Sequence, residues 1–430
     1  MSMQSSTHNN LALTTLIASL GGFLFGFDMA VVSGVLPFVQ EQFNLTAAQQ
    51  GWFVSSALAG CIIGVIFASD LGDRLGRKKV MLLAAVLFLL AAAGCTFIPV
   101  FSLLILARIL GGLAVGIASS IVPLYLSEIA PDHQRGRLVT FYQLAITIGI
   151  FIAYLSNALL LQYAADAGGL ALWRKMFGVG IIPALLFLLG VTIIPESPRW
   201  LKQRHAATVS AAPAAGGYGQ LFAPVYRRAL LIGILLPLFS QFSGINAIIY
   251  YGPTILHKAG ITLSNSLLSQ LFFGAANVFF TLFAIWKVDS LGRRPLYLWG
   301  TAGAAVSLVL TGICFYTGAT TGIYLLLCVL AFLAFFAFSI GPLKFVIAAE
   351  IFPDHIRAKA LSFSIMVMWI ADTIVGQLTP MLLNGIGTAP TFWFFALFCV
   401  LAFITVYKLV PETKGQSIEQ IQAHWNKIMH

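Results

Sequence analysis

The stretch SEIAPDHQRGRLVTF at residues 127–141 decides the fold class, because it returns as AEIFPDHIRAKALSF at residues 349–363. Both copies lie between long apolar segments and keep the same charged and proline residues in the same order. The matched residues are Glu128 and Glu350, Pro131 and Pro353, Asp132 and Asp354, His133 and His355, and Arg135 and Arg357. Self-similarity of this kind indicates two homologous halves.

Two further charged signatures repeat in the same order. LGRKK at 75–79 returns as LGRRP at 291–295, and PESPRW at 195–200 returns as PETKGQ at 411–416. Parallel repeats within a long apolar chain are typical of secondary transporters, whose binding site lies between the repeats. The repeats therefore predict a transporter.

The composition indicates a polytopic membrane protein. Of the 430 residues, 59% are hydrophobic and only 9% are charged, so a soluble fold could not cover its surface with polar groups. The net charge of +10 gathers in loops on one side of the expected bilayer, which argues against nucleic acid as a partner. The five cysteines fall inside apolar segments without paired spacing and indicate neither a disulfide framework nor a metal site.

A membrane-spanning helix needs about twenty mostly apolar residues. Twelve such spans are expected, at roughly 12–38, 48–69, 80–98, 101–124, 138–161, 173–194, 228–256, 265–287, 294–316, 322–347, 358–384 and 390–410. Lys and Arg concentrate in the loops after even-numbered spans and in the tail, which places both termini in the cytoplasm. The fold class is thus an all-α membrane protein of two six-helix halves.

Four regions follow from these spans. We expect an N-terminal six-helix half at 1–200, a cytoplasmic linker at 201–227, a C-terminal six-helix half at 228–410 and a cytoplasmic tail at 411–430. Ala, Gly and Pro without periodicity indicate that the linker is flexible.

Taken in order, the signatures resemble those of the sugar porters of the major facilitator superfamily. The matching segments are GGFLFGFD at 21–28, DRLGRKK at 73–79, RILGG at 108–112, PESPRWL at 195–201, QFSGINAIIYY at 241–251, GRR at 292–294 and PETKG at 411–415. The chain is similar in particular to bacterial proton-coupled monosaccharide symporters. This resemblance implies a major facilitator fold in the cell membrane, with alternating access to a central cavity.

Charged residues near the cytoplasmic ends of the expected helices recur in both halves. An acid and a base at helix ends on one membrane face can form salt bridges that must break when that face opens. They could instead be topology signals on a solvated face. In the family the same motifs resemble a network that holds the outward-facing state. The candidate gating residues are Asp73, Arg74, Arg77, Glu128, Arg135, Glu196, Arg199, Asp289, Arg293, Glu350, Arg357 and Glu412.

Four charged residues lie inside expected spans and away from the span ends: Asp28, Arg108, Lys344 and Asp372. A charge at the bilayer centre costs about 3 kcal/mol on insertion scales, so each must be paired or functional. If contact between Asp28 and Arg108 forms in one conformation and loosens in another, Asp28 would bind and release a proton once per cycle. The resemblance implies this coupling role for both residues. The alternative is a static ion pair that fixes helix packing.

Lys344 and Asp372 stand where the family usually has uncharged residues. Three interpretations of Lys344 are open: an ion pair with Asp372, extension to the cytoplasmic surface, or contact with an anionic sugar such as a uronate.

A sugar site needs amides for hydroxyl groups and aromatic rings for C–H faces. Gln241 and Asn246 lie about 140° apart on an ideal helix, but a break at Gly244 would turn both inward. Each amide could instead form an interhelical hydrogen bond. Judged by the family's sugar-contacting positions, the candidate substrate-binding residues are Phe25, Gln143, Gln241, Asn246, Tyr250, Tyr251, Asn277, Gly341, Phe345 and Trp369.

Three positions depart from the family pattern. Phe345 stands where the family usually has Trp, Ser240 where it often has Gln, and Met368 where an amide is common. These departures indicate an altered specificity within the same fold.

The sequence therefore predicts a proton-coupled importer of a monosaccharide, hexose or pentose, that acts as a monomer in the lipid bilayer. The alternatives are a facilitative sugar uniporter and a non-transporting sugar sensor on the same fold. No nucleophile–base set, metal-ligand spacing or phosphate-binding loop is present, so we expect no enzyme activity, no catalytic residues, no metal and no cofactor.

Overall fold

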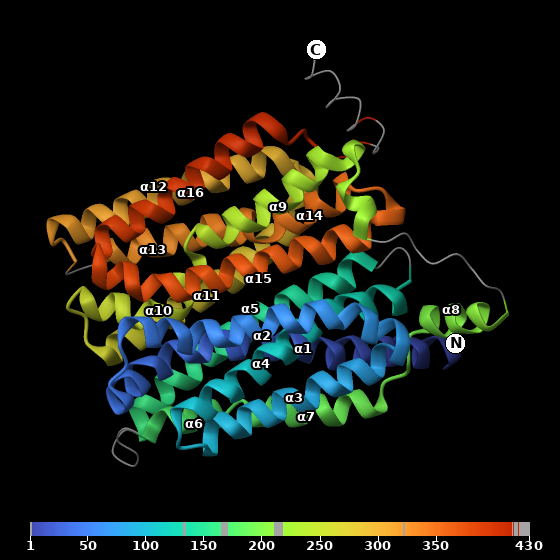
Figure 1. Ribbon diagram of the computed structural model, residues 1–430, viewed down its shortest axis with the longest axis horizontal. Coiled ribbons are helices and arrows are strands. Elements are labelled where there is room, and N and C mark those ends of the chain that lie inside the picture. The colour runs from blue at the N-terminus through green and yellow to red at the C-terminus, as the bar shows by residue number, and fades with distance from the viewer. Residues whose placement is uncertain are drawn as a thin grey trace. The chain divides into compact units, whose positions relative to one another are not determined.

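The computed structural model describes residues 2–131, 135–164, 171–209, 218–320, 323–414, 416 and 420. Within this part of the chain, twelve helices are long and apolar enough to cross a membrane (Figure 1). The prediction of an all-α, twelve-span chain is confirmed. The helices divide into two compact units, which are described separately below.

The first unit comprises Met1–Pro213 and Leu263–Gly274. Its helices are α1 (Ser2–Phe43), α2 (Ala47–Leu75), α3 (Arg77–Phe97), α4 (Phe101–Ile129), α5 (Arg135–Ala164), α6 (Leu172–Gly178), α7 (Ile181–Ile193) and α8 (Pro198–Val209). Helix α1 packs along α5 and α4, and α2 packs along α4 (Figure 1). The sixth predicted span is therefore two short helices, α6 and α7.

Glycines bring α2 and α4 into close contact. A Cβ atom at Gly112 would lie 1.7 Å from the carbonyl oxygen of Ala57, and one at Gly116 would lie 2.2 Å from that of Cys61. Small residues at a membrane helix interface let two backbones approach, and van der Waals packing replaces the missing hydrophobic drive. This contact fixes the position of α4 against α2. Arg108 lies on α4, one turn before Gly112.

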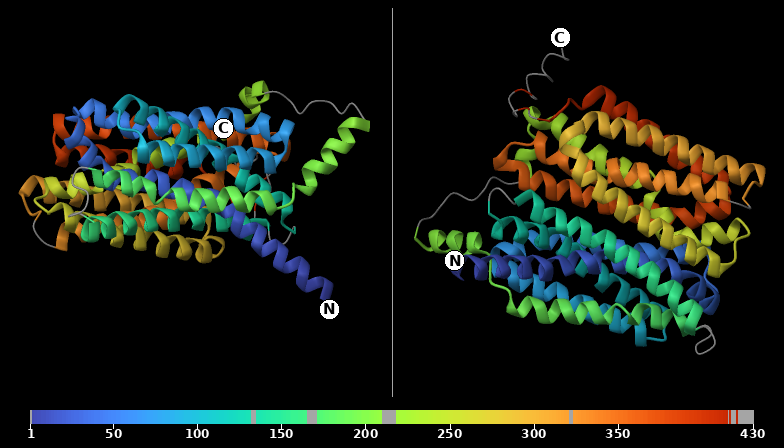
Figure 2. Two further views of the ribbon diagram at one scale, coloured as in Figure 1. Left: turned by 90° about the horizontal axis from the view of Figure 1, so that it is seen from below. Right: turned by 180° about the vertical axis from the view of Figure 1, so that it is seen from behind.

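The second unit comprises Ala214–Thr262 and Ala275–His430. Its elements are η3 (Tyr218–Phe222), η4 (Pro224–Tyr226), α9 (Arg227–Phe242), α10 (Ile245–Lys258), the greater part of α11 (Leu263–Leu291), α12 (Arg293–Thr317), α13 (Ile323–Phe335), the π-helical η5 (Phe336–Ile340), α14 (Gly341–Ile351), α15 (Asp354–Gly385) and α16 (Thr388–Leu409). Helix α12 packs against α16, and α9 packs against α15 and α16 (Figures 1 and 2).

One prediction about the linker is wrong. The composition of residues 201–227 predicts flexibility throughout, but α8 continues from Pro198 to Val209. Its start is well specified, because Pro occupies the first helical turn and the backbone N–H of Trp200 donates to Ser197 Oγ at 3.2 Å. The residues that follow, LKQR, are good helix formers and extend it.

Candidate functional site

The structure brings the predicted coupling pair of the first unit together. Arg108 Nη1 on α4 lies 3.2 Å and 3.1 Å from the two carboxylate oxygens of Asp28 on α1. The Arg108 side chain is 1% exposed, whereas that of Asp28 is 19% exposed. The guanidinium also lies over the rings of Phe53 and Phe177, 5.9 Å and 5.7 Å from their centroids. A buried cation thus contacts a carboxylate that is partly exposed.

The Arg108 guanidinium is not fully satisfied by protein atoms. Its Nε is buried without a hydrogen-bond partner, and its contacts with Asp28 run through a single nitrogen. A bidentate pair would use two nitrogens of the guanidinium fork and would hold more strongly. The observed geometry suits a contact that loosens when the carboxylate gains a proton.

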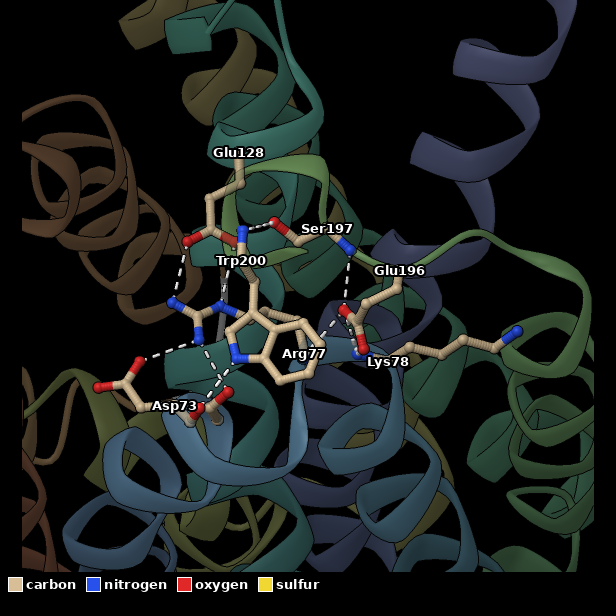
Figure 3. Close-up of polar contacts among 8 residues, drawn as sticks. Asp73, Arg77, Lys78, Glu128, Glu196, Ser197 and Trp200 are labelled. Carbon is tan, nitrogen blue, oxygen red and sulfur yellow. Dashed lines mark hydrogen bonds and ion pairs between the residues drawn. The ribbon is translucent and has the colours of Figure 1, made fainter. Parts of the chain in front are cut away.

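Arg77 is the centre of the first charged network (Figure 3). Its Nε and Nη2 each donate at 3.0 Å to one oxygen of Glu128, which is the bidentate arrangement. Its Nη1 also donates to Asp73 at 2.9 Å. The side chains of Arg77 and Glu128 are 5% and 3% exposed, while that of Asp73 is 68% exposed. The Arg77–Glu128 pair is therefore the buried part of the network.

Glu196, in the segment before α8, also belongs to this network. Its carboxylate accepts backbone N–H groups of Arg77 at 3.0 Å, Lys78 at 3.1 Å and Ser197 at 2.8 Å (Figure 3). It therefore occupies the N-terminus of α3, where unsatisfied N–H groups and the helix dipole favour an anion. Gly76 makes this possible, since it has φ +96° and a Cβ there would lie 2.3 Å from the carboxylate.

The second unit repeats this geometry with its own residues. Arg293 Nη2 lies 2.9 Å from Glu350, and Glu412 accepts the backbone N–H groups of Arg293 at 3.0 Å and Arg294 at 3.2 Å. Gly292 has φ +86°, and its Cβ would lie 2.7 Å from Glu412. The Arg293 and Glu350 side chains are 14% and 29% exposed. The repeat predicted from sequence is thus also a structural repeat, with a less buried ion pair in the second unit.

The remaining candidate gating residues are Arg74, Arg135, Arg199, Asp289 and Arg357. Arg74 and Arg199 are exposed, and neither joins an ion pair between described residues. Arg357 is half-buried, and its Nε donates to the carbonyl of Phe352 at 3.1 Å. The side chains of Arg135 and Asp289 are outside the part of the chain that the structure describes.

The predicted break in the seventh span is confirmed. Helix α9 ends at Phe242, Gly244 adopts φ +84°, and α10 begins at Ile245. Because of this break, Asn246 Nδ2 reaches Gln241 Oε1 at 2.9 Å, although the two residues would lie on different faces of a continuous helix. Gln241 is buried and Asn246 is half-buried.

Gly244→Ala is expected to lower stability by about 3 kcal/mol or more. Left-handed backbone costs an L-residue about 1–2 kcal/mol, and the new Cβ would lie 2.6 Å from the Phe395 ring. Gly260→Ala is the matched control, because Gly260 also has φ +84° but a Cβ there would meet no atom within 4 Å. Thermal unfolding of the purified variants would measure both. Equal losses in the two variants would show that packing against Phe395 is unimportant.

Two tyrosine hydroxyls tie α10 to α15. Tyr250 donates to Asp372 Oδ2 at 3.0 Å, and Tyr251 donates to the carbonyl of Gly376 at 2.6 Å. Both tyrosines are buried, as is Trp369 on α15. These hydroxyls therefore hold interhelical hydrogen bonds in this conformation.

The other candidate substrate residues are more accessible. In the first unit, Phe25 on α1 is half-buried and Gln143 on α5 is exposed. In the second unit, Asn277 on α11 is half-buried, as are Gly341 and Phe345 on α14.

Lys344 occupies a position that none of the three interpretations describes fully. It is 7% exposed, so it does not extend to the surface, and its Nζ donates to Ser240 Oγ at 2.9 Å. The amine also lies 5.2 Å from the centroid of the Phe345 ring. Asp372 is 1% exposed, and the described residues include no ion pair between it and Lys344. Sequence alone does not predict the Ser240 contact, although Ser240 is one of the departures from the family pattern.

Comparisons with known proteins agree with this architecture. Residues 14–425 match a family model described as sugar (and other) transporter. The arabinose-proton symporter of Bacillus subtilis (strain 168) is 36% identical over 440 residues, which cover 96% of this chain and 95% of the relative. The D-xylose-proton symporter of Escherichia coli (strain K12) is 35% identical over 470 residues, covering 96% and 95%. A partially occluded inward-open structure of the E. coli xylose transporter matches with a TM-score of 0.82 at 34% identity, covering 95% of this chain and 100% of that one.

Proposed function

This chain belongs to the sugar porter family of the major facilitator superfamily, and we propose that it imports a monosaccharide together with a proton by alternating access. It is a multi-pass protein of the cell membrane. The observation that carries proton coupling is the buried contact between Asp28 and Arg108.

The coupling follows from the charges of this pair. While Asp28 is ionised, it neutralises Arg108, which is sealed among aromatic rings. Protonation of Asp28 removes that partner, so the attraction between α1 and α4 weakens and the helices can rearrange. Deprotonation on the cytoplasmic side restores the pair and resets the cycle. A uniporter needs no such group, and an ionisable residue inside a span is costly to keep without a function.

The sugar would be a neutral pentose or hexose. Relatives named for arabinose and D-xylose support this class, as does one named as a glucose transporter from Staphylococcus epidermidis. Gln241 and Asn246 would contribute amide hydrogen bonds, and the half-buried Phe345 would contribute an aromatic surface for the C–H face. The other residues that would contact the sugar are those expected from the sequence, namely Phe25, Gln143, Tyr250, Tyr251, Asn277, Gly341 and Trp369.

The two charged networks would act as latches of the outward-facing state. Each joins an arginine at the start of one helix to a glutamate at the end of another, so both must break when the cytoplasmic side opens. We further infer that both termini are cytoplasmic and that the boundaries at 1–200, 201–227, 228–410 and 411–430 separate halves, linker and tail. The transporter would act as a monomer, without nucleic acid and without catalysing a chemical reaction.

Uptake into proteoliposomes tests this function. Labelled L-arabinose, D-xylose, D-glucose and D-glucuronate would be supplied with and without an inward proton gradient. We expect at least one neutral sugar to accumulate above its external concentration only when the gradient is present. Equilibration that ignores the gradient would identify a facilitative uniporter, and failure of every sugar to enter would favour a sensor.

A further inference from the structure

Four buried polar side chains gather around the broken seventh span. Ser240 lies near the end of α9, Tyr250 on α10, Lys344 on α14 and Asp372 on α15, and each is at most 7% exposed. Ser240 bonds Lys344, and Tyr250 bonds Asp372. The cluster thus contains two hydrogen bonds, each between a hydroxyl group and an ionisable side chain. The hydroxyl of Ser240 comes from the helix before Gly244, and that of Tyr250 from the helix after it.

Neither charge in this cluster has all its hydrogen bonds satisfied. An ammonium group has three N–H donors, and Lys344 uses one for Ser240. Asp372 accepts Tyr250 on Oδ2, and its buried Oδ1 has no partner within hydrogen-bond geometry, although the Asn246 side chain lies beside this carboxylate. Lys344 and Asp372 form no direct ion pair between the described atoms, but their hydroxyl partners Ser240 and Tyr250 flank the same helix break at Gly244. Unused donors and an unused acceptor therefore lie in one buried region.

A hydroxyl group complements such a pair. It accepts a hydrogen bond from an ammonium and donates one to a carboxylate. Hydrogen bonds to ionised partners are roughly twice as strong as those between neutral groups. Building on the proposed sugar transport, we propose that Lys344 and Asp372 form a charged dyad that binds hydroxyl groups of a neutral sugar and determines its specificity.

The charge of the dyad selects a neutral ligand over a uronate. When both are ionised, Lys344 and Asp372 together carry no net charge, so a neutral sugar leaves the buried region neutral. A carboxylate ligand would add a negative charge near Asp372, and an uncompensated charge in a buried site is costly. The third interpretation of Lys344, a uronate site, is therefore the one that the dyad disfavours.

The dyad is continuous with the residues assigned to sugar binding. Ser240 precedes Gln241 in the chain, Tyr250 contacts Asp372, and the Lys344 amine lies over Phe345. Asn246 and Phe345 are half-buried, so a ligand that contacts them would have the dyad behind it. Access to the dyad would open as the helices around Gly244 rearrange.

Binding to the unmodified protein provides the first test. Isothermal titration of the purified transporter would compare the preferred neutral sugar with its monodeoxy analogues and its uronate. Loss of a hydroxyl that meets the dyad leaves a charged group unpaired, so we expect at least one analogue to bind about 10- to 100-fold more weakly. The uronate is expected to bind more weakly than the neutral sugar. Tighter binding of the uronate, or analogues that all bind within about threefold of the parent, would overturn the dyad.

Variants separate ligand contact from helix packing. Lys344→Met and Asp372→Asn should each lower the thermal stability of the protein more than the double variant does, because a single change leaves one buried charge without its partner. In the double variant, the discrimination against the deoxy analogue should shrink to about threefold or less. Lys258→Met is the control, since Lys258 lies in the same unit and bonds Asn384 instead. Its discrimination should equal that of the unmodified protein.

The outcomes distinguish this inference from the proposed function. If the double variant keeps the full discrimination, the dyad does not touch the sugar, while sugar transport stands. If the unmodified protein binds no monosaccharide, both the dyad and the proposed function fail.

Discussion

Replacing Asp28 with Asn is expected to abolish accumulation of sugar against its gradient while leaving sugar exchange intact. Asparagine keeps the size of aspartate and can still accept a hydrogen bond from Arg108, but it cannot gain and lose a proton. One pH unit supplies about 1.4 kcal/mol, which supports roughly tenfold accumulation at one proton per sugar. The ratio of internal to external sugar should therefore be about 10 for the unmodified protein and about 1 for the variant.

The measurement is uptake into proteoliposomes with the gradient imposed, followed by counterflow with labelled sugar on both sides. Glu41→Gln is the matched control, because Glu41 is an exposed carboxylate on the same helix, α1. It should leave accumulation unchanged. Continued accumulation by Asp28→Asn would mean that the Asp28–Arg108 pair only fixes helix packing.

Replacing Arg77 with Met is expected to have the second largest effect, by breaking the buried charged network at the start of α3. The change leaves Glu128 with a side chain that is 3% exposed and has lost its bidentate partner. Breaking a buried ion pair from one side costs about 3–5 kcal/mol. The transport state that contains this network should therefore lose population, and uptake should fall by at least about tenfold.

Arg293→Met is the natural comparison for this change. Its partner Glu350 is 29% exposed and also accepts a hydrogen bond from Thr413, so water and Thr413 can compensate part of the loss. We expect a cost of about 1 kcal/mol for this partly exposed pair. Thermal unfolding and uptake would be measured for both variants, and for Arg77→Met combined with Glu128→Gln. The combination should recover part of the loss. Equal effects of Arg77→Met and Arg293→Met would contradict the role given to burial.

Much of the site could be predicted because its parts recur in the sequence. The repeat places Arg77 and Arg293 at helix starts, and it gives each a glutamate from two later segments. A positive-φ position such as Gly244 is also readable, because a glycine between two amides in an apolar span permits a break. Local backbone chemistry and repetition carry these predictions.

The contacts of Lys344 could not be predicted in the same way. Sequence gives the approximate depth of a residue in the membrane, but not how each helix is rotated about its axis. Lys344 lies on α14, directly after a π-helical segment that alters this rotation. Whether its amine meets Ser240, Asp372 or the surface therefore depends on packing between helices that are far apart in the sequence.

Helix α8 is not predicted from the sequence, for a different reason. Its helix-forming residues stand directly before an Ala- and Gly-rich segment, and the average composition of 201–227 hides them. Propensity over a short window, rather than over the whole linker, favours the helix.

Proton movement driven by sugar is the most direct test of coupled import. Proteoliposomes in a lightly buffered medium would receive the preferred sugar without any imposed proton gradient, and the external pH would be recorded. Coupled import predicts that the medium becomes more alkaline as sugar enters, and that Asp28→Asn shows sugar exchange without this change. Sugar entry by the unmodified protein with no change in external pH would contradict proton coupling.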